Sequence, residues 1–344
     1  MTSSRVQPCL LVAALSVACS RTCENKPPPV EEPQRTVTAD SDSTLEIVSE
    51  GAEPRHRLEV GRWAGLRYRL ELSVDASLGI VGHPPLRAPT HVLVSSVEVL
   101  RGMADPVLRE HGGRERRFVE ERIVVDDARA ESEELAPDAL AGVNGALVGL
   151  RGLVIRQLVG EDGEVASLET ELVGGKPPTP DVKRLLDTTM DSQRRFPFRL
   201  PHKPVGVGAK WRFRESITLQ NVRLWQVSEM TFSRLTADRV TIALRVRHEA
   251  PRQEVPHPLD PAHTATVEQY RGDGSGELVM DRLSAVLIAG RLQTTGSLRL
   301  SWEHEGQAHS AMLVAASTTR LRGQVGDPPA DAGPAATEGG DSSP

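Results

Sequence analysis

The stretch LRYRLELSV, residues 66–74, decides the fold of this chain. Its apolar residues alternate with charged or polar ones, so an extended strand here has one apolar face and one wet face. Short turn signals such as EDGE at 161–164 separate many similar stretches, which predicts hairpins and an antiparallel sheet. The further predicted strands are residues 92–100, 118–125, 153–159, 165–172, 211–219, 227–235, 239–247, 278–280, 284–287, 292–302 and 308–321.

Two segments follow helical spacing instead. Residues 137–150 begin with a proline suited to a first helical turn, and residues 181–195 follow Thr179-Pro180 with apolar side chains along one face. The order of these elements predicts an α+β protein that is mostly β. We expect one or more curved antiparallel sheets, or a half-barrel, with one or two helices covering the apolar face.

The first nineteen residues have the pattern of an export signal. Arg5 precedes an apolar run at 10–17, and Ser16-Val17-Ala18 stands directly before Cys19. Cleavage after residue 18 would leave Cys19 as a lipidation site, and acyl chains such as palmitate on it would anchor the protein to a membrane. An ordinary peptidase cut with a secreted product stays open, because Ser16 stands where a lipoprotein signal usually has Leu. The apolar run is too short to span a bilayer.

These patterns divide the chain into a signal peptide, residues 1–18, a disordered tether, residues 19–43, a β-rich domain, residues 44–323, and a disordered acidic tail, residues 324–344. Trp63 and Trp211 each precede an alternating stretch, so the domain could consist of two similar halves, 44–196 and 197–323.

Charge and cysteine content exclude several classes of function. The formal net charge is -6 and the basic residues are scattered, so we expect no nucleic-acid partner. The three cysteines, Cys9, Cys19 and Cys23, all precede the predicted domain, which therefore has no disulfide framework and no thiolate metal site. Aromatic residues make up only 3% of the chain, too few for a stacking platform for sugars or single strands, and the four tryptophans are interpreted as core or core-rim residues.

The residues that could carry chemistry do not form a recognised site. His257 and His263 flank Asp260 in the best metal candidate, but no third histidine or cysteine stands at a ligand spacing. His304 and His309 straddle a predicted hairpin turn. The serine of GDGSG, residues 272–276, is one position away from a nucleophile elbow, and a strand follows it, so this segment is interpreted as a flexible link.

Adjacent carboxylates occur at 120–121, 126–127 and 133–134, but neighbours on a strand point to opposite faces, so these are interpreted as solvated edges. We therefore predict no catalytic residue, no metal site and no cofactor.

The segment FRLPHKPVGVGAKW, residues 198–211, resembles a phrase shared by secreted and lipid-anchored bacterial proteins, many from myxobacteria, that have no assigned activity. The resemblance extends over roughly residues 140–322 and implies a β-rich envelope protein. A looser likeness is to half-barrel carriers of lipoproteins, in which a curved sheet holds an acyl chain under a helical lid. Without any family, the prolines and glycines of the phrase predict an architectural turn that leads into a strand at Trp211.

The sequence thus favours a non-enzymatic lipoprotein of the bacterial cell envelope, in the outer membrane rather than elsewhere, or a secreted protein if Cys19 is not lipidated. Its partners would be the membrane, through the lipid anchor, and an apolar ligand or an envelope protein. Two alternatives remain open: a secreted hydrolase of unrecognised type, and a structural or assembly factor whose sheet edge pairs with another chain.

Overall fold

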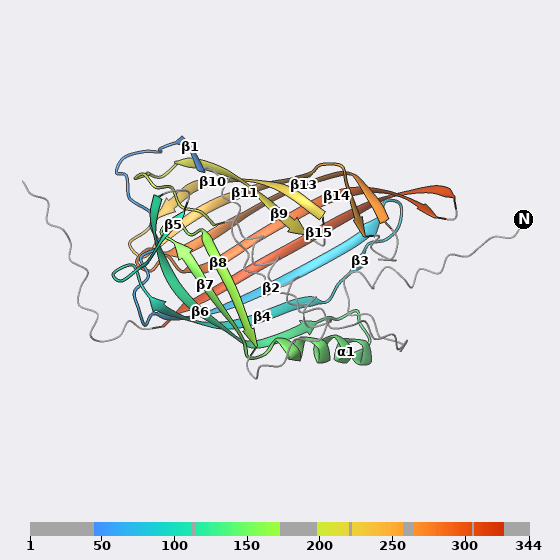
Figure 1. The fold of residues 1–344 in the computed structure, drawn as a ribbon, viewed down its shortest axis with the longest axis horizontal. Coiled ribbons are helices and arrows are strands. Elements are labelled where there is room, and N and C mark those ends of the chain that lie inside the picture. The colour runs from blue at the N-terminus through green and yellow to red at the C-terminus, as the bar shows by residue number, and fades with distance from the viewer. Residues whose placement is uncertain are drawn as a thin grey trace, which may run out of the picture.

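The structure is a computed structural model that describes residues 45–111, 114–172, 198–219, 222–256, 264–304 and 306–326. Within these ranges the chain forms fifteen strands, one α-helix and one 3-10 turn (Figure 1). The elements are β1 (Leu45–Ser49), β2 (Arg67–Ile80), β3 (Leu86–Arg87), β4 (Thr90–Arg101), β5 (Val107–His111), β6 (Arg114–Glu131), α1 (Pro137–Leu147), η3 (Val148–Leu150), β7 (Leu153–Gly160), β8 (Val165–Leu172), β9 (Lys210–Leu219), β10 (Val222–Leu235), β11 (Arg239–Ala250), β12 (Gln253–Pro256), β13 (Thr264–Asp281), β14 (Leu287–His304) and β15 (Gln307–Val325).

All fifteen strands belong to one sheet, which confirms the predicted antiparallel β-rich fold. The order of its main path is β1-β9-β10-β11-β13-β14-β15-β2-β4-β6-β7-β8, and the pairs along it are antiparallel. The strands before residue 173 and those after residue 209 thus form two neighbouring meanders that join where β15 pairs with β2. β1 is the exception, because it lies on the far edge beside β9. The path does not close on itself, since β1 and β8 have one neighbour each.

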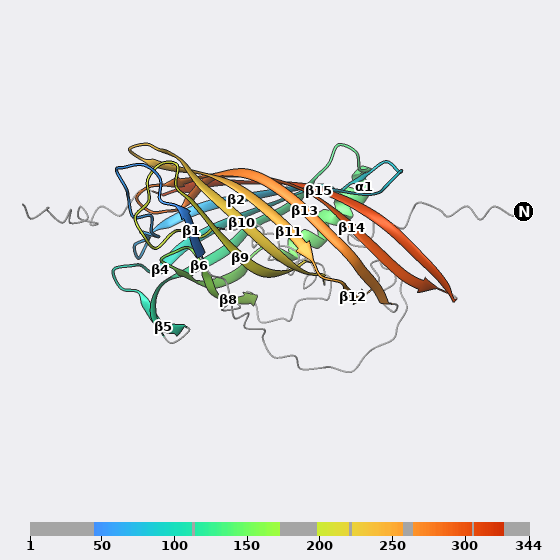
Figure 2. The same ribbon diagram turned by 90° about the horizontal axis from the view of Figure 1, so that it is seen from above.

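The sheet is rolled around one hydrophobic core. In Figure 1 the green strands β7 and β8 pass in front of β15 and β2, and the view from above in Figure 2 separates the two layers. We call the face that lines this interior the inner face. Its main core draws side chains from both meanders, among them Tyr68 and Leu93 from one, and Trp211, Phe232 and Leu244 from the other. The alternation read at residues 66–74 fits this roll, since Tyr68 and Leu72 are buried while Arg67 and Arg69 are exposed.

Two segments outside the strands close one end of the roll. Residues 50–66 and 198–209 run together there, joined by backbone hydrogen bonds between Ala52 and Val207 and between His56 and Val205. Gly206 makes their close approach possible, because a Cβ at this position would lie 1.6 Å from the carbonyl oxygen of Ala52. The phrase around residues 198–211 is therefore architectural, as predicted, and Trp211 is completely buried.

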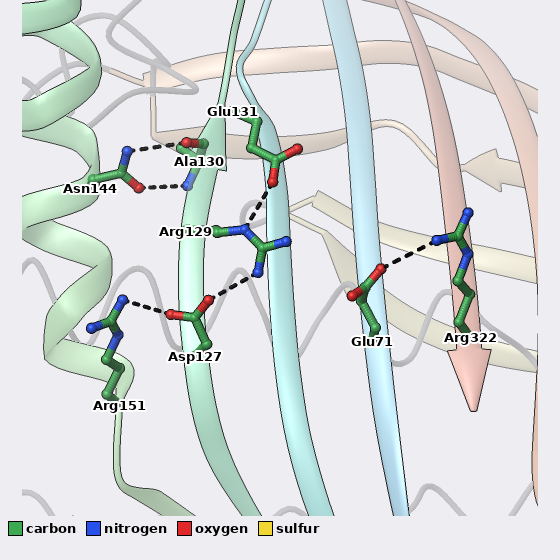
Figure 3. Close-up of polar contacts among 8 residues, drawn as sticks. All are labelled: Glu71, Asp127, Arg129, Ala130, Glu131, Asn144, Arg151 and Arg322. Atoms are coloured by element: carbon green, nitrogen blue, oxygen red, sulfur yellow. Dashed lines mark hydrogen bonds and ion pairs between the residues drawn. The ribbon is translucent and has the colours of Figure 1, made fainter. Parts of the chain in front are cut away.

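The helix predicted at 137–150 is present as α1 and η3, and it lies along β6 rather than across the sheet. Where β7 no longer pairs with β6, the Asn144 side chain accepts a hydrogen bond from the Ala130 amide at 2.7 Å and donates to the Ala130 carbonyl at 3.1 Å (Figure 3). Val143 and Leu147 add to the main core. The second predicted helix, at 181–195, lies outside the described residues. Among the described helices, none has the length and apolar character needed to cross a bilayer.

Two strand predictions need correction. Residues 284–286 belong to the turn before β14, which begins only at Leu287: the Asp281 carboxylate accepts hydrogen bonds from the Ser284 amide and hydroxyl, and Ala285 has a positive φ of 54°. The segment GDGSG at 272–276 is not a flexible link before a strand but the middle of β13. Its glycines allow neighbouring strands to approach closely, as shown by the 2.0 Å between a Cβ at Gly276 and the carbonyl oxygen of Arg291.

Candidate functional site

The inner face differs between the two ends of the roll. At the closed end, beneath residues 50–66 and 198–209, the inner side chains are fully buried, as in Trp211, Met230 and Leu244. At the other end, which we call the open end, the strand register aligns His248, Gly272, Gly296, Ala315 and Leu78 in one row. The last three of these residues are only half-buried. The β14–β15 hairpin extends beyond the other strands at this end (Figures 1 and 2).

A polar belt crosses the inner face at the border of the open end, and His248 belongs both to this belt and to the row described above. We define it as Glu215, Gln226, Ser228 and His248, from strands β9, β10 and β11. The Gln226 amide donates to Glu215 at 2.6 Å, and its oxygen lies 2.6 Å from Nε2 of His248. An amide oxygen can only accept, so Nε2 of His248 carries the proton in this pair. Within the belt, hydrogen bonds therefore run from His248 through Gln226 to the Glu215 carboxylate.

Ser228 differs from the other residues of the belt. Its side chain is completely buried and lies on the same face as Gln226 and Met230, which precede and follow it by two residues on β10. Its hydroxyl has no hydrogen-bond partner among the described residues. Such a group costs about 1–3 kcal/mol relative to a hydrogen-bonded one.

Small side chains continue the row of Ser228 across strands β13, β14 and β15. Gly274, Thr294 and Ser317 follow Ser228 and Val246 in one row of the register, and the hydroxyls of Thr294 and Ser317 lie 2.8 Å apart. The Tyr270 hydroxyl lies over two glycines, 3.1 Å from a Cβ at Gly272 and 2.8 Å from one at Gly296. A Cβ at Gly272 would also lie 3.4 Å from Nδ1 of His248. Tyr270 and His248 therefore border the same space.

A second apolar cluster lies beyond the belt, at the open end. It is separate from the main core and combines buried side chains with partly buried ones. The buried members are Val255, Ala265, Val267 and Leu300, and the partly buried ones are Val222, Ala250, Tyr270, Leu298, Trp302 and Leu313. The inner face thus carries two apolar regions with polar and small residues between them.

Glu121 is the centre of a buried ionic group near the closed end. It is fully buried, forms an ion pair with Arg62, and accepts hydrogen bonds from the Tyr68 hydroxyl at 2.9 Å and the Gln157 amide at 2.7 Å. Burial lowers the pKa of Arg62, but the Glu121 charge outweighs it and the pKa stays above its usual value. Burial raises the pKa of Tyr68 well above 10, so the phenol remains a donor. Three side chains thus contact the Glu121 carboxylate, although Nε of Arg62 has no hydrogen-bond partner among the described residues, and the close pairing of the charges favours a structural role.

A second ionic group joins the two edges of the sheet. Asp162 and Glu164, between β7 and β8, face two arginines. Arg116 on β6 lies 3.0 Å from Asp162 and 2.6 Å from Glu164. Arg199 forms an ion pair with Glu164. We call these four residues the clamp. Arg199 leads into β9, and its carbonyl accepts a hydrogen bond from the Trp211 indole at 2.8 Å. The clamp therefore holds β7–β8 against the start of β9.

The outer face near α1 carries exposed ion pairs. Asp127 is contacted by Arg129 at 2.9 Å and by Arg151 at 2.6 Å, and Glu71 lies 3.9 Å from Arg322 (Figure 3). The Arg129 hydrogen bond and then Arg151 hold the pKa of Asp127 below its usual value despite a contribution from burial. Such pairs on a solvated face contribute little to stability, and this arrangement offers no enclosed space for a substrate.

Most of the singled-out residues lie outside the described ranges or in ordinary surroundings. Cys19, His257 and His263 lie outside the described residues. The predicted hairpin between His304 and His309 is confirmed, and the His309 ring stacks on Trp302 with centroids 5.7 Å apart. Across the described parts of the chain, no three His, Cys, Asp or Glu side chains gather in an arrangement that could hold a metal ion.

Two interpretations of side chains need correction. Glu121 is not part of a solvated edge, because its strand turns it inwards to Arg62, while Glu120 points outwards and lies 3.5 Å from Arg101. Trp225 is not a core residue: it lies on the outer face of β10, half-buried, with the Arg214 guanidinium 4.3 Å from the ring centroid.

Ser275 is exposed on the outer face of β13, away from the inner site.

The polar belt was not predicted from the sequence, although a signal for it exists. Gln226, Ser228 and His248 occupy positions where the alternation of β10 and β11 calls for apolar residues. A polar residue in an apolar register marks either a buried network or a site.

Comparison with known proteins adds little. No protein-family model and no curated protein matches this chain. Among solved structures, the chain is similar to an in-vitro folded, trimeric form of OmpT, an outer membrane protein of Vibrio cholerae. The match covers 76% of this chain and 100% of that one, with 9% identity and a TM-score of 0.16. A likeness this distant carries no argument about fold or function.

Proposed function

We propose that this protein is a non-enzymatic lipoprotein of the bacterial cell envelope, anchored through Cys19, whose rolled sheet binds an apolar ligand on its inner face. The observation that carries the proposal is the half-buried inner face at the open end, next to a second apolar cluster. Ligand sites in proteins are mostly apolar with a few placed polar groups, which matches this combination.

The small residues at the open end favour a ligand over a self-filled core. Gly296, Ala315 and Ser317 place little side-chain volume on the inner face, whereas the corresponding positions at the closed end hold Trp211 and Phe232. A core that must fill itself uses large side chains, because unfilled space is costly. In this proposal α1, which packs beside β6 through Val143 and Leu147, forms one side of a cover over the open end.

The test is to purify the full-length protein from membranes and to identify bound apolar compounds by mass spectrometry after extraction. We expect a near-stoichiometric compound in the natural protein, and at least a fivefold loss in Ala315→Leu, which fills the inner row. Ala316→Leu is the matched control, because its side chain lies on the opposite face of the same strand and is equally half-buried. The anchor is tested in parallel, since Cys19→Ser should abolish labelling by radioactive palmitate.

Absence of any apolar compound from the natural protein would contradict the ligand proposal. Equal loss in Ala315→Leu and Ala316→Leu would also contradict it, because the effect would then be one of general stability. Palmitate labelling that survives in Cys19→Ser would contradict the anchor alone.

A further inference from the structure

Five buried side-chain polar atoms have no hydrogen-bond partner among the described residues, and two of them belong to strand residues of the inner face. The Ser228 hydroxyl on β10 and Nε2 of His91 on β4 have no hydrogen-bond partner among the described residues. Both side chains share the inner face: Ser228 with Met230, and His91 with Leu93, which belongs to the main core. Buried polar groups in native proteins are almost always paired, so two such atoms on one face call for an explanation.

The belt cannot easily supply the missing partner for Ser228. Gln226 already forms hydrogen bonds with Glu215 and His248. The residues paired with Ser228 on the neighbouring strands, Phe213 and Val246, are apolar. On β13, the same row continues with Gly274, which has no side chain to offer. A group brought in by a ligand can reach a hydroxyl in such surroundings more readily than a side chain can.

Charge restricts what that group can be. Gln226, Ser228 and Tyr270 each belong to a row of paired residues that crosses the neighbouring strands. None of the inner-face residues in these three rows is a lysine or an arginine. The one carboxylate in them, Glu215, accepts a hydrogen bond from Gln226. Burial lowers the pKa of His91, which keeps that ring neutral. An anionic headgroup beside Ser228 would therefore find no lysine or arginine in these rows of described residues, which makes its burial unfavourable.

We infer that the ligand is an amphiphile with a neutral, hydrogen-bonding head, such as an acyl glycerol or a fatty alcohol. Its head lies at the polar belt against Ser228, and its chain lies on the second apolar cluster of the open end. This inference rests on the proposed function, because it names the chemical class of the apolar ligand. The half-buried Leu298, Leu313 and Trp302 supply the surface for the chain.

The experiment compares two brominated probes with the same chain. Dibromostearoyl glycerol is neutral and dibromostearate is anionic, and both quench tryptophan fluorescence on contact. Titrated into the full-length protein in mild detergent, the neutral probe should bind at least tenfold more tightly. Trp302→Phe should lose most of the quenching without losing binding, because Trp302 is the tryptophan in the second apolar cluster.

Ser228→Ala separates a binding role from a packing role. Removing one hydrogen bond to the head should weaken the neutral probe about five- to tenfold. The same substitution removes an unsatisfied buried hydroxyl, so the ligand-free protein should melt about 2 °C or more higher. Ser275→Ala, on the outer face of β13, should change neither quantity.

Equal affinity for the two probes, or unchanged affinity of the stabilised Ser228→Ala protein, would overturn this inference and leave the proposed function intact. If neither probe binds and no apolar compound co-purifies with the protein, the proposed function itself fails.

Discussion

The closed and open ends of the roll are built from the same strands, yet they bury their inner side chains to different degrees. At the closed end, β10 places Met230 and Phe232 under complete cover, and residues 50–66 and 198–209 supply that cover. At the open end, β14 and β15 present Gly296, Ala315 and Ser317 half-buried. The difference shows that alternation in a strand specifies which face turns inwards, while segments far away in the sequence decide whether that face is sealed.

The size of the side chains follows the same division. Where the two segments close the roll, the inner face uses a tryptophan and large aliphatic residues, which pack to the density of an ordinary core. Where the roll stays open, glycine, alanine, serine and threonine line the middle of the sheet. The first region therefore holds the fold together, and the second is where we propose that the ligand binds.

The largest expected effect comes from removing one tryptophan at each end. Trp211→Ala should lower the free energy of unfolding by about 3–5 kcal/mol, because it empties the closed end and removes the hydrogen bond to the Arg199 carbonyl. Trp302→Ala, in the half-buried cluster of the open end, should cost roughly 1–2 kcal/mol. Urea denaturation of both variants measures the difference. Equal losses would mean that the two ends contribute alike to stability, which would break the comparison.

A smaller effect is expected at the clamp that holds the sheet edges together. Arg199→Met leaves Glu164 and Asp162 with Arg116 as their remaining cation in the clamp, so the free energy of unfolding should fall by roughly 2–3 kcal/mol. Hydrogen exchange should increase most at the backbone bonds between the two edges, such as the one from Leu200 to the Asp162 carbonyl.

The control for the clamp is Arg212→Met, which breaks an exposed ion pair with Glu46 on the edge strand β1. Exposed pairs contribute at most about 1 kcal/mol, so this variant should remain close to the natural protein. If exchange rises evenly over the whole sheet in Arg199→Met, the clamp is a general stabiliser and not a specific closure of the edges.

Much of the sheet was predictable because strand alternation is local. Residues 67–74 of the first predicted strand and residues 239–247 lie within β2 and β11, and the helix at 137–150 was predicted from its spacing and its proline. A strand was predicted at 284–287, but β14 begins only at Leu287, because Ala285 and Val286 are buried in the core although the backbone turns there. GDGSG at 272–276 was misread because glycine usually marks loops, whereas here it serves close packing between long strands.

The candidate site was not predictable by the same means, because it depends on register between distant strands. Only pairing of β10 with β11 and of β11 with β13 brings Ser228 to the row of Gly274. Burial of Glu121 likewise depends on Arg62, which is far from it in sequence and outside any strand. A charged residue in a strand is exposed unless such a partner exists, and no local pattern reveals the partner.

The smallest expected effect concerns the outer face of the open end, where Asp75 links three strands. Burial raises the pKa of Asp75, but hydrogen bonds from Thr90 on β4 and Arg320 on β15 outweigh it and hold the pKa below its usual value. A lowered folded-state pKa stabilises the fold above the unfolded value of about 4, and the contribution is lost as pH falls through the folded value.

Asp75→Asn should therefore destabilise the protein at pH 7 and match it at low pH. Because the side chain is 38% exposed, solvent screening limits the difference at pH 7 to about 0.5 kcal/mol. Thr90→Val, which removes one of the two partners, should give part of that difference. Chemical denaturation at pH 7 and at pH 3 measures both variants. A loss of unfolding free energy clearly larger than this at pH 7 would show that ion pairs on the outer face stabilise the open end. The contrast between the two ends would then extend beyond the interior of the roll.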